Sequence, residues 1–173
     1  IYPNFLTSRP KRHMTIRDLL SHMSGLTYDF MLRTNVDAAY RKTKVQATGD
    51  LQAMIDTLAE LPLEFSPGDQ WNYSVSTDVC GYLVEYFSGM KLDQYFQKHI
   101  FDPLSMEDTG FSCSKDKVDR LASLYEQHPK KGPVLVDPGG AKTARVKKRK
   151  MLSGGGGLLS TMSDYYRFCS MLL

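Results

Sequence analysis

A polar turn between two helical patterns constrains the fold of this chain more than any other feature. Residues 71–76 read Trp-Asn-Tyr-Ser-Val-Ser and closely follow a turn that contains Pro67-Gly68. Before this turn, apolar residues recur at helical spacing over 50–61, and Pro62 stops the pattern. After it, a second apolar stripe runs to Gly89, with N-cap candidates at 76–78. The sequence therefore predicts two helices joined by a polar segment.

Tyr73 lies in that segment, about one helical turn before the second predicted helix. Its hydroxyl can lie near the positive end of the helix dipole and near other hydrogen-bond donors, and both favour the phenolate. A phenolate in a cleft is a candidate general base. The alternative is that Tyr73 is one of ten tyrosines that pack at the edge of a core.

A third helix is predicted near the beginning of the chain. A Thr-x-x-Asp capping box at 15–18 opens it, and it runs to about Ser24 with Gly25 at the C-cap. We expect its apolar stripe to face the core; the stripe is Ile16, Leu19, Leu20 and Met23. His22 flanks that face, and we interpret it as a structural histidine.

The rest of the chain shows both helical and strand patterns. Helices are predicted at 92–100 and 162–173, with short strands around 123–125 and 134–136. A Gly-rich loop precedes the last helix. These elements predict a mostly helical chain with a small amount of strand.

Three stretches, at 14–26, 67–74 and 153–161, resemble a known family. They contain Leu-Leu-Ser-His-Met-Ser-Gly-Leu, then Pro-Gly-Asp-Gln-Trp-Asn-Tyr-Ser, then Ser-Gly-Gly-Gly-Gly-Leu-Leu-Ser-Thr. In this order they closely resemble the serine beta-lactamase-related family, which includes class C beta-lactamases, D-alanyl-D-alanine carboxypeptidases and family VIII esterases. The resemblance implies an α+β fold of the beta-lactamase/transpeptidase type. Because no strand-rich terminal segments are visible, we expect residues 1–173 to be an internal part of one such domain, mostly its helical lobe.

The family's nucleophile is the Ser of an S-x-x-K motif, in which one helical turn places the Lys amine beside the hydroxyl. The expected place of that motif falls upstream of this chain, and the downstream K-T-G or H-x-G motif is absent. We therefore expect a fragment that is inactive alone. Three S-x-x-K strings are interpreted as chance spacings: Ser8 with Lys11, Ser112 with Lys115, and Ser114 with Lys117.

The resemblance implies that Tyr73 acts with the absent Lys to take the Ser proton and return it to the leaving group. Ser74 and Val75 are expected to border the substrate. The family's Y-x-N pattern has Asn where this chain has Val75. Because valine cannot hydrogen-bond a beta-lactam or a peptide, this departure favours an esterase.

The Gly-rich loop at 153–157 permits close backbone approach, and Gly155 and Gly156 are expected to line the substrate cleft. A phosphate-binding loop is the rival interpretation, but the loop lacks the G-K-[ST] ending. The predicted function is a serine hydrolase that cleaves ester or amide bonds through an acyl-enzyme. A catalytically silent binding module and a self-assembling scaffold are the alternatives.

Composition limits the partners. The net charge is +3, from 22 basic and 19 acidic residues, which is too near balance to imply a polyanionic partner. A basic run at 142–150 is interpreted as a solvated loop rather than a nucleic-acid arm. We expect a small ester or amide substrate, and neither nucleic acid nor a membrane-spanning segment.

No cofactor or metal is expected, because His13, His22, His99 and His128 are scattered along the chain. The three cysteines have no paired spacing, which mildly favours a reducing, cytoplasmic compartment, while a signal peptide upstream stays open. The oligomeric state is not predicted.

Overall fold

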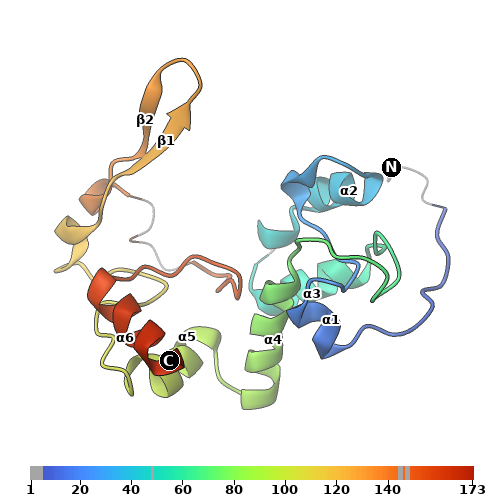
Figure 1. Cartoon of the computed structure of the whole chain (residues 1–173), viewed down its shortest axis with the longest axis horizontal. Helices are drawn as coiled ribbons and strands as arrows, with labels where there is room; N and C mark the ends of the chain where they lie inside the picture. The colour runs from blue at the N-terminus through green and yellow to red at the C-terminus, as the bar shows by residue number, and fades with distance from the viewer. Residues whose placement is uncertain (1–5, 48, 144–145, 147–148) are drawn as a thin grey trace. The chain divides into compact units, whose positions relative to one another are not determined.

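The computed structural model in Figure 1 describes residues 6–47, 49–143, 146 and 149–173. The chain forms two compact units. The tyrosine unit is Ile1–Phe96 with Lys150–Gly157, and the hairpin unit is Gln97–Arg149 with Leu158–Leu173. The predicted basic run at 142–150 lies partly outside the described residues. That both units belong to one domain over 1–173 stays a prediction.

The tyrosine unit is helical. Its elements are α1 (Ile16–Leu20), the 3-10 turns η1 (Asp29–Met31) and η2 (Val45–Ala47), and α2 (Asn35–Thr43), α3 (Leu51–Ala59), α4 (Ser76–Ser88) and α5 (Leu92–Phe96). The two helices predicted around the polar turn are confirmed as α3 and α4. Asp50 caps α3 by accepting a hydrogen bond from the Ala53 N–H at 3.1 Å.

The N-terminus of α4 differs from the prediction. Its N-cap is Val75, and no side chain caps it. Ser76 and Asp78, predicted as N-cap candidates, are completely buried inside the first turn. Their side chains are committed to other segments, because Ser76 bonds Ser24 and Asp78 bonds Ser153. The C-terminus matches the prediction, since Gly89 adopts a left-handed φ of 68°.

Helix α1 is shorter than predicted. The Thr15–Asp18 capping box is present, but the helix ends at Leu20 because His22 adopts a left-handed φ of 57°. The C-cap is Ser21, so the assignment of Gly25 to that position is wrong. A five-residue helix buries only one side. Consequently Leu19 is buried, whereas Ile16 and Leu20 are exposed, contrary to the predicted stripe.

Helix α2 was not predicted, although a capping box opens it. The Thr34 hydroxyl accepts a hydrogen bond from the Asp37 N–H, and the Asp37 carboxylate accepts one from the Thr34 N–H. Val36, Ala39 and Tyr40 bury the inner face of the helix. Burial raises the pKa of the Tyr40 hydroxyl. The same Thr-x-x-Asp signal that marks α1 was therefore present at 34–37.

The hairpin unit contains η3 (Gln97–Phe101, a π-helix turn), η4 (Val118–Arg120), β1 (Leu124–His128), β2 (Gly132–Asp137), η5 (Gly140–Lys142) and α6 (Met162–Leu172). The two predicted strands are confirmed, and they pair antiparallel with Tyr125 opposite Leu135. The final helix is confirmed as α6, which Thr161 caps. The helix predicted over 92–100 is α5 followed by η3.

No helix in the described part of the chain is long and apolar enough to cross a membrane.

Candidate active site around Tyr73

Tyr73 lies on an extended segment whose side chains alternate between solvent and interior. Trp71 and Tyr73 are 67% and 43% exposed, whereas Asn72 and Ser74 are 4% and 0% exposed. This alternation is the side-chain pattern of a strand that is buried on one face. The phenol of Tyr73 is therefore presented at the surface, while the residues on both sides of it anchor the backbone.

The segment is held by the loop that follows α1. The backbone N–H of Asn72 donates to the carbonyl oxygen of His22 at 2.8 Å, and that of Val75 donates to the carbonyl oxygen of Thr27 at 3.3 Å. Between them, the N–H of Ser74 donates to Nδ1 of the His22 ring at 3.3 Å. The first and second stretches of the family resemblance are thus one hydrogen-bonded structure.

Asn72 ties this structure to its surroundings. Its amide Nδ2 donates to the carbonyl oxygen of Leu26 and to the carboxylate of Glu64, each at 2.9 Å, and its Oδ1 accepts from Arg33. Every hydrogen-bonding group of this buried amide has a partner, so the base of the segment is polar and rigid.

Three buried serines form a line behind Tyr73. The hydroxyl of Ser76 lies 2.7 Å from that of Ser24 and 2.7 Å from that of Ser74. The Ser24 hydroxyl also accepts from the Leu26 N–H at 3.2 Å. All three side chains are 0% exposed. Since Ser76 begins α4, this line fastens the helix N-terminus to the loop after α1.

Five rings form a continuous row through Tyr73. Ring centroids are 6.1 Å apart for Trp71 and His22, 5.0 Å for His22 and Tyr73, 5.1 Å for Tyr73 and Tyr28, and 4.7 Å for Tyr28 and Phe30. Phe30 at one end is 58% exposed, and Trp71 at the other is 67% exposed. These separations are those of aromatic pairs in contact. The row therefore links two exposed rings, those of Trp71 and Phe30, through Tyr73.

Tyr28 is a member of this row and Asp78 acts on its hydroxyl, and neither was predicted from the sequence as a site residue. Tyr28 is 5% exposed. Burial, the negative charge of Asp78 and the neighbouring Tyr73 together raise the pKa of its hydroxyl to about 12, against a hydrogen bond with Thr77 that lowers it. The available signal was position, because Tyr28 closely follows the Ser-Gly-Leu element and Asp78 lies one helical turn beyond Ser74.

The Gly-rich loop reaches the same place through Asp78. The Asp78 carboxylate accepts a hydrogen bond from the Ser153 hydroxyl, whose oxygen accepts from the Gly155 N–H at 3.0 Å. A Cβ atom on Gly155 would lie 2.6 Å from Thr77 Oγ1 and 3.3 Å from the Tyr28 hydroxyl. Only glycine allows this close approach.

The predicted site residues occupy different environments. Tyr73 is exposed, and Gly155 lies against Tyr28 and Thr77. Gly156 is exposed, and nothing lies within 4 Å of the position of its Cβ. The side chains of Ser74 and Val75 are 0% and 1% exposed, so their predicted border with substrate stays a prediction. The structure brings Tyr73, Ser74, Val75 and Gly155 into one unit.

Comparison with known proteins now identifies the family. The profile of the family described as Beta-lactamase matches residues 2–173. The chain belongs to the beta-lactamase family. The predicted resemblance is thereby confirmed.

Among relatives in this family, Protein Rv1367c of Mycobacterium tuberculosis is 34% identical over 174 aligned positions, which cover 96% of this chain and 40% of that protein. Lovastatin esterase of Penicillium rubens is 31% identical over 171 positions, which cover 97% of this chain and 42% of that enzyme. The chain thus spans about two fifths of the length of these relatives.

The solved structure of EstCE1, described as a hydrolase with promiscuous acyltransferase activity, has a TM-score of 0.76 and 25% identity. The match covers 92% of this chain and 45% of EstCE1. The predicted beta-lactamase/transpeptidase-like fold is confirmed.

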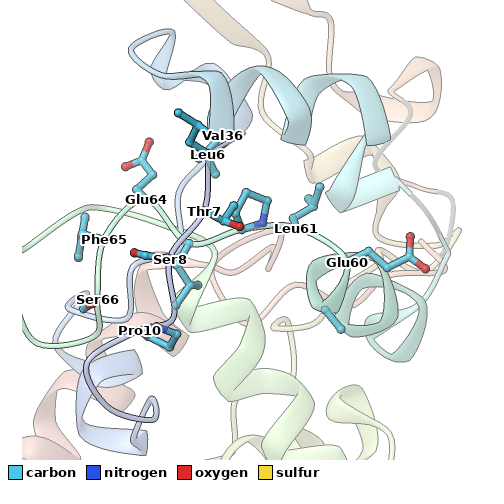
Figure 2. A pocket seen from close by; sticks show the side chains of 13 residues that line it. Leu6, Thr7, Ser8, Pro10, Val36, Glu60, Leu61, Glu64, Phe65 and Ser66 are labelled. Carbon is cyan, nitrogen blue, oxygen red and sulfur yellow. The ribbon is translucent and has the colours of Figure 1, made fainter. Parts of the chain in front are cut away.

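In two of the S-x-x-K strings the lysine forms an ion pair with an aspartate. Ser8 lines a cavity of about 730 Å³ between the segment at 6–10 and residues 59–66 (Figure 2), while the Lys11 amine is paired with Asp69 at 2.8 Å. Ser114 lines a smaller cavity of about 300 Å³ in the hairpin unit, and its partner Lys117 binds Asp108 at 2.8 Å.

The hydrogen bond to Asp108 raises the pKa of Lys117. A lysine held in its protonated form cannot accept the proton of a serine hydroxyl. Ser112 lines the same cavity as Ser114.

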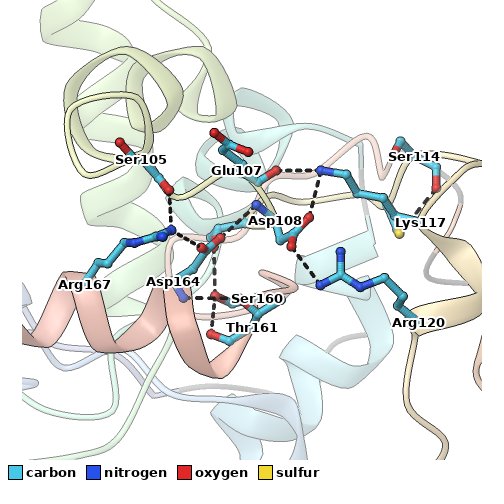
Figure 3. A network of polar contacts seen from close by, with 12 residues as sticks. Ser105, Glu107, Asp108, Ser114, Lys117, Arg120, Ser160, Thr161, Asp164 and Arg167 are labelled. Carbon is cyan, nitrogen blue, oxygen red and sulfur yellow. Dashed lines mark hydrogen bonds and ion pairs between the residues drawn. The ribbon is translucent and has the colours of Figure 1, made fainter.

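Figure 3 shows the polar network of which Lys117 is a member. Asp108 also binds Arg120 at 2.8 Å, and these two cations lower its pKa to about 2. Asp164, in the first turn of α6, accepts from the Asp108 N–H at 2.8 Å and from Arg167 at 3.0 Å. The network joins α6 to the turn at 105–109.

Within the described ranges, no group of three or more His, Cys, Asp or Glu side chains is arranged to hold a metal ion.

Proposed function

We propose that this chain is part of a longer serine hydrolase that cleaves esters through an acyl-enzyme, with Tyr73 in the proton-transfer machinery. One observation carries the proposal. The Tyr73 phenol is exposed, while hydrogen bonds from both neighbouring residues fix the backbone that carries it. A side chain that is accessible and rigidly mounted suits general acid–base catalysis.

In this proposal the Ser and Lys of an S-x-x-K motif come from a part of the polypeptide outside this chain. The serine oxygen attacks the ester carbonyl, its proton passes to the Tyr73–Lys pair, and the proton is returned to the alcohol that leaves. Water then attacks the acyl-enzyme by the same route, and the serine is released. The membership of this chain in the beta-lactamase family and the esterase among its relatives support this assignment.

Tyr28 has a defined part in this scheme. Because its pKa is raised to about 12, Tyr28 keeps its proton under conditions in which Tyr73 transfers one. A neutral Tyr28 hydroxyl hydrogen-bonds Tyr73 and donates to the oxygen as negative charge develops there.

The substrates we propose are esters with a sizeable apolar group. Trp71 and Phe30 are the two ends of the aromatic row that contains Tyr73, and both are exposed. In the family's Y-x-N pattern the position of Val75 is an Asn whose amide can hydrogen-bond a beta-lactam or a peptide, and valine offers no such group. An apolar surface without that amide favours esters over amides.

The first experiment is Tyr73→Phe in the whole protein, with p-nitrophenyl butyrate as substrate. We expect kcat to fall by roughly a hundredfold or more, because the phenol oxygen that carries the proton is gone. Tyr125→Phe is the matched control, since Tyr125 is an exposed tyrosine on β1, and it should leave kcat unchanged. Wild-type turnover by Tyr73→Phe contradicts the proposed role.

The second experiment tests the aromatic row with acetate, butyrate and octanoate esters of p-nitrophenol. Trp71→Ala should raise KM for the octanoate by roughly tenfold, because about 1.5 kcal/mol of apolar contact is lost. The acetate should be nearly unaffected. Phe87→Ala, which removes an exposed ring from α4, should change neither. An equal effect of Trp71→Ala on all three esters argues against an apolar subsite.

A further inference from the structure

His22 holds the backbone on both sides of Tyr73. The N–H of Asn72, the residue before Tyr73, donates to the carbonyl oxygen of His22 at 2.8 Å. The N–H of Ser74, the residue after it, donates to His22 Nδ1 at 3.3 Å. His22 therefore accepts a hydrogen bond from the backbone N–H of the residue before Tyr73 and from that of the residue after it.

This geometry indicates the tautomer of the neutral ring. A backbone N–H can only donate, so Nδ1 must present a lone pair to Ser74. In the neutral imidazole the proton then lies on Nε2. The Ser74 hydroxyl lies 3.4 Å from Nδ1 and also forms a hydrogen bond of 2.7 Å with the Ser76 hydroxyl, which keeps Ser74 in place.

An unusual backbone conformation brings the ring to this position. His22 has a φ of 57°, in the left-handed region that few residues other than glycine adopt. Its N–H bonds the Leu19 carbonyl at 3.3 Å as α1 ends, and the chain then turns toward the Tyr73 segment. The imidazole packs against Tyr73, with ring centroids 5.0 Å apart. Strain of this kind persists where the surrounding structure over-determines it.

We propose that His22 is a positioning residue that sets the place of Tyr73 for proton transfer, acting through its Nδ1 lone pair and its carbonyl oxygen. This inference rests on the proposed function of Tyr73. It assigns His22 more than the structural role expected from sequence. Since a displacement of about 1 Å at a reacting group can reduce a rate on the order of a hundredfold, loss of the Nδ1 bond should appear in kcat rather than in KM.

Two substitutions separate the lone pair from the ring. His22→Asn keeps an acceptor, because Asn Oδ1 is as many bonds from Cβ as Nδ1 is, and Asn tolerates a left-handed φ. His22→Phe keeps a ring against Tyr73 but has no acceptor. In the whole protein we expect His22→Phe to lower kcat on the order of a hundredfold with KM nearly constant, and His22→Asn to stay within about tenfold of wild type.

The outcomes are distinct. If folded His22→Phe turns over like wild type, or if His22→Asn falls as far as His22→Phe, the Nδ1 bond does not position Tyr73. If Tyr73→Phe itself keeps wild-type turnover, the proposed function fails whatever the His22 variants do. Circular dichroism and unfolding midpoints identify a variant that has lost its fold.

A measurement without turnover covers the case in which His22→Phe does not fold. Long-range ¹H–¹⁵N correlation spectra of the wild-type protein distinguish a ring nitrogen that carries hydrogen from one that does not. We expect the neutral His22 ring to show hydrogen on Nε2 and a bare Nδ1. Hydrogen on Nδ1 would overturn the proposal, because that nitrogen could not then accept from Ser74.

Discussion

Two buried carboxylates, one in each unit, have opposite kinds of partner. Asp164 in the hairpin unit is 3% exposed, and it binds the Arg167 guanidinium at 3.0 Å and the Asp108 N–H at 2.8 Å. Asp78 in the tyrosine unit is 0% exposed, and its described hydrogen bonds come from the neutral groups of Ser153 and Gln46.

The difference separates a carboxylate that holds two segments together from one that lies in a candidate active site. We call the polar network of Asp164, Asp108 and their partners, which holds α6 to the turn at 105–109, the joint. The charge of Asp164 is offset locally by a cation, the guanidinium of Arg167. The charge of Asp78 is not offset in this way and acts on the Tyr28 hydroxyl, whose pKa it helps to raise to about 12. Perturbed groups of this kind gather where a protein carries out chemistry.

The largest expected effect is the loss of stability when Asp164 is removed from the joint. Asp164→Ala should lower the free energy of unfolding by about 3 kcal/mol, because it leaves the buried Asp108 N–H without its acceptor and removes one of the partners of Arg167 and of the Thr109 hydroxyl. Asp119→Ala, which removes the same charge from an exposed position, is the control and should change stability little. Urea unfolding of each variant measures both. If the two variants are equally stable, Asp164 does not stabilise the fold more than an exposed aspartate does, and the joint is not structural.

A smaller effect is expected where Asp78 anchors the Gly-rich loop through Ser153. A Cβ atom on Gly154 would lie 2.2 Å from the Thr77 carbonyl oxygen and 3.0 Å from the Gly81 nitrogen. Gly154→Ala should therefore lower the free energy of unfolding by about 2 kcal/mol, because backbone must move.

Gly156→Ala is the matched control for that loop, since nothing lies within 4 Å of its Cβ position, and it should cost less than about 0.5 kcal/mol. If Gly154→Ala is as stable as Gly156→Ala, the loop is not held against α4 as described. Thermal unfolding of both variants decides this.

The smallest effect is a difference in acid titration between the units. Arg120 and Lys117 hold the pKa of Asp108 at about 2, below its ordinary 3.8, so this pairing stabilises the fold above pH 3.8 and is lost as pH falls toward about 2. Arg12 and Thr15 hold the pKa of Asp18 in the tyrosine unit lower still, so its pairing is lost at lower pH.

Carboxyl ¹³C shifts followed by NMR give both midpoints. Arg120→Gln should raise the Asp108 midpoint and leave that of Asp18 in place. An Asp108 midpoint near its ordinary value in the wild-type protein would contradict the ion-pair description of the joint.

Much of the fold was predictable because local rules and tertiary packing agree. The apolar spacing of α3, the glycine after α4 and the cap before α6 are each specified by a few neighbouring residues. The errors fall where distant contacts outweigh local preference. Helix α1 ends early because His22 turns toward Tyr73, and the first turn of α4 lacks a side-chain cap because Ser76 and Asp78 bond other segments.

The sequence by itself determined the family and singled out Tyr73, since both depend on short motifs read in order. Only the tertiary structure placed His22, Tyr28 and Asp78 around that segment. His22 lies 52 positions from Ser74, and Asp78 lies 75 from Ser153. Contacts across such separations form when buried polar groups find partners in the folded chain, and no local pattern encodes which partners they find.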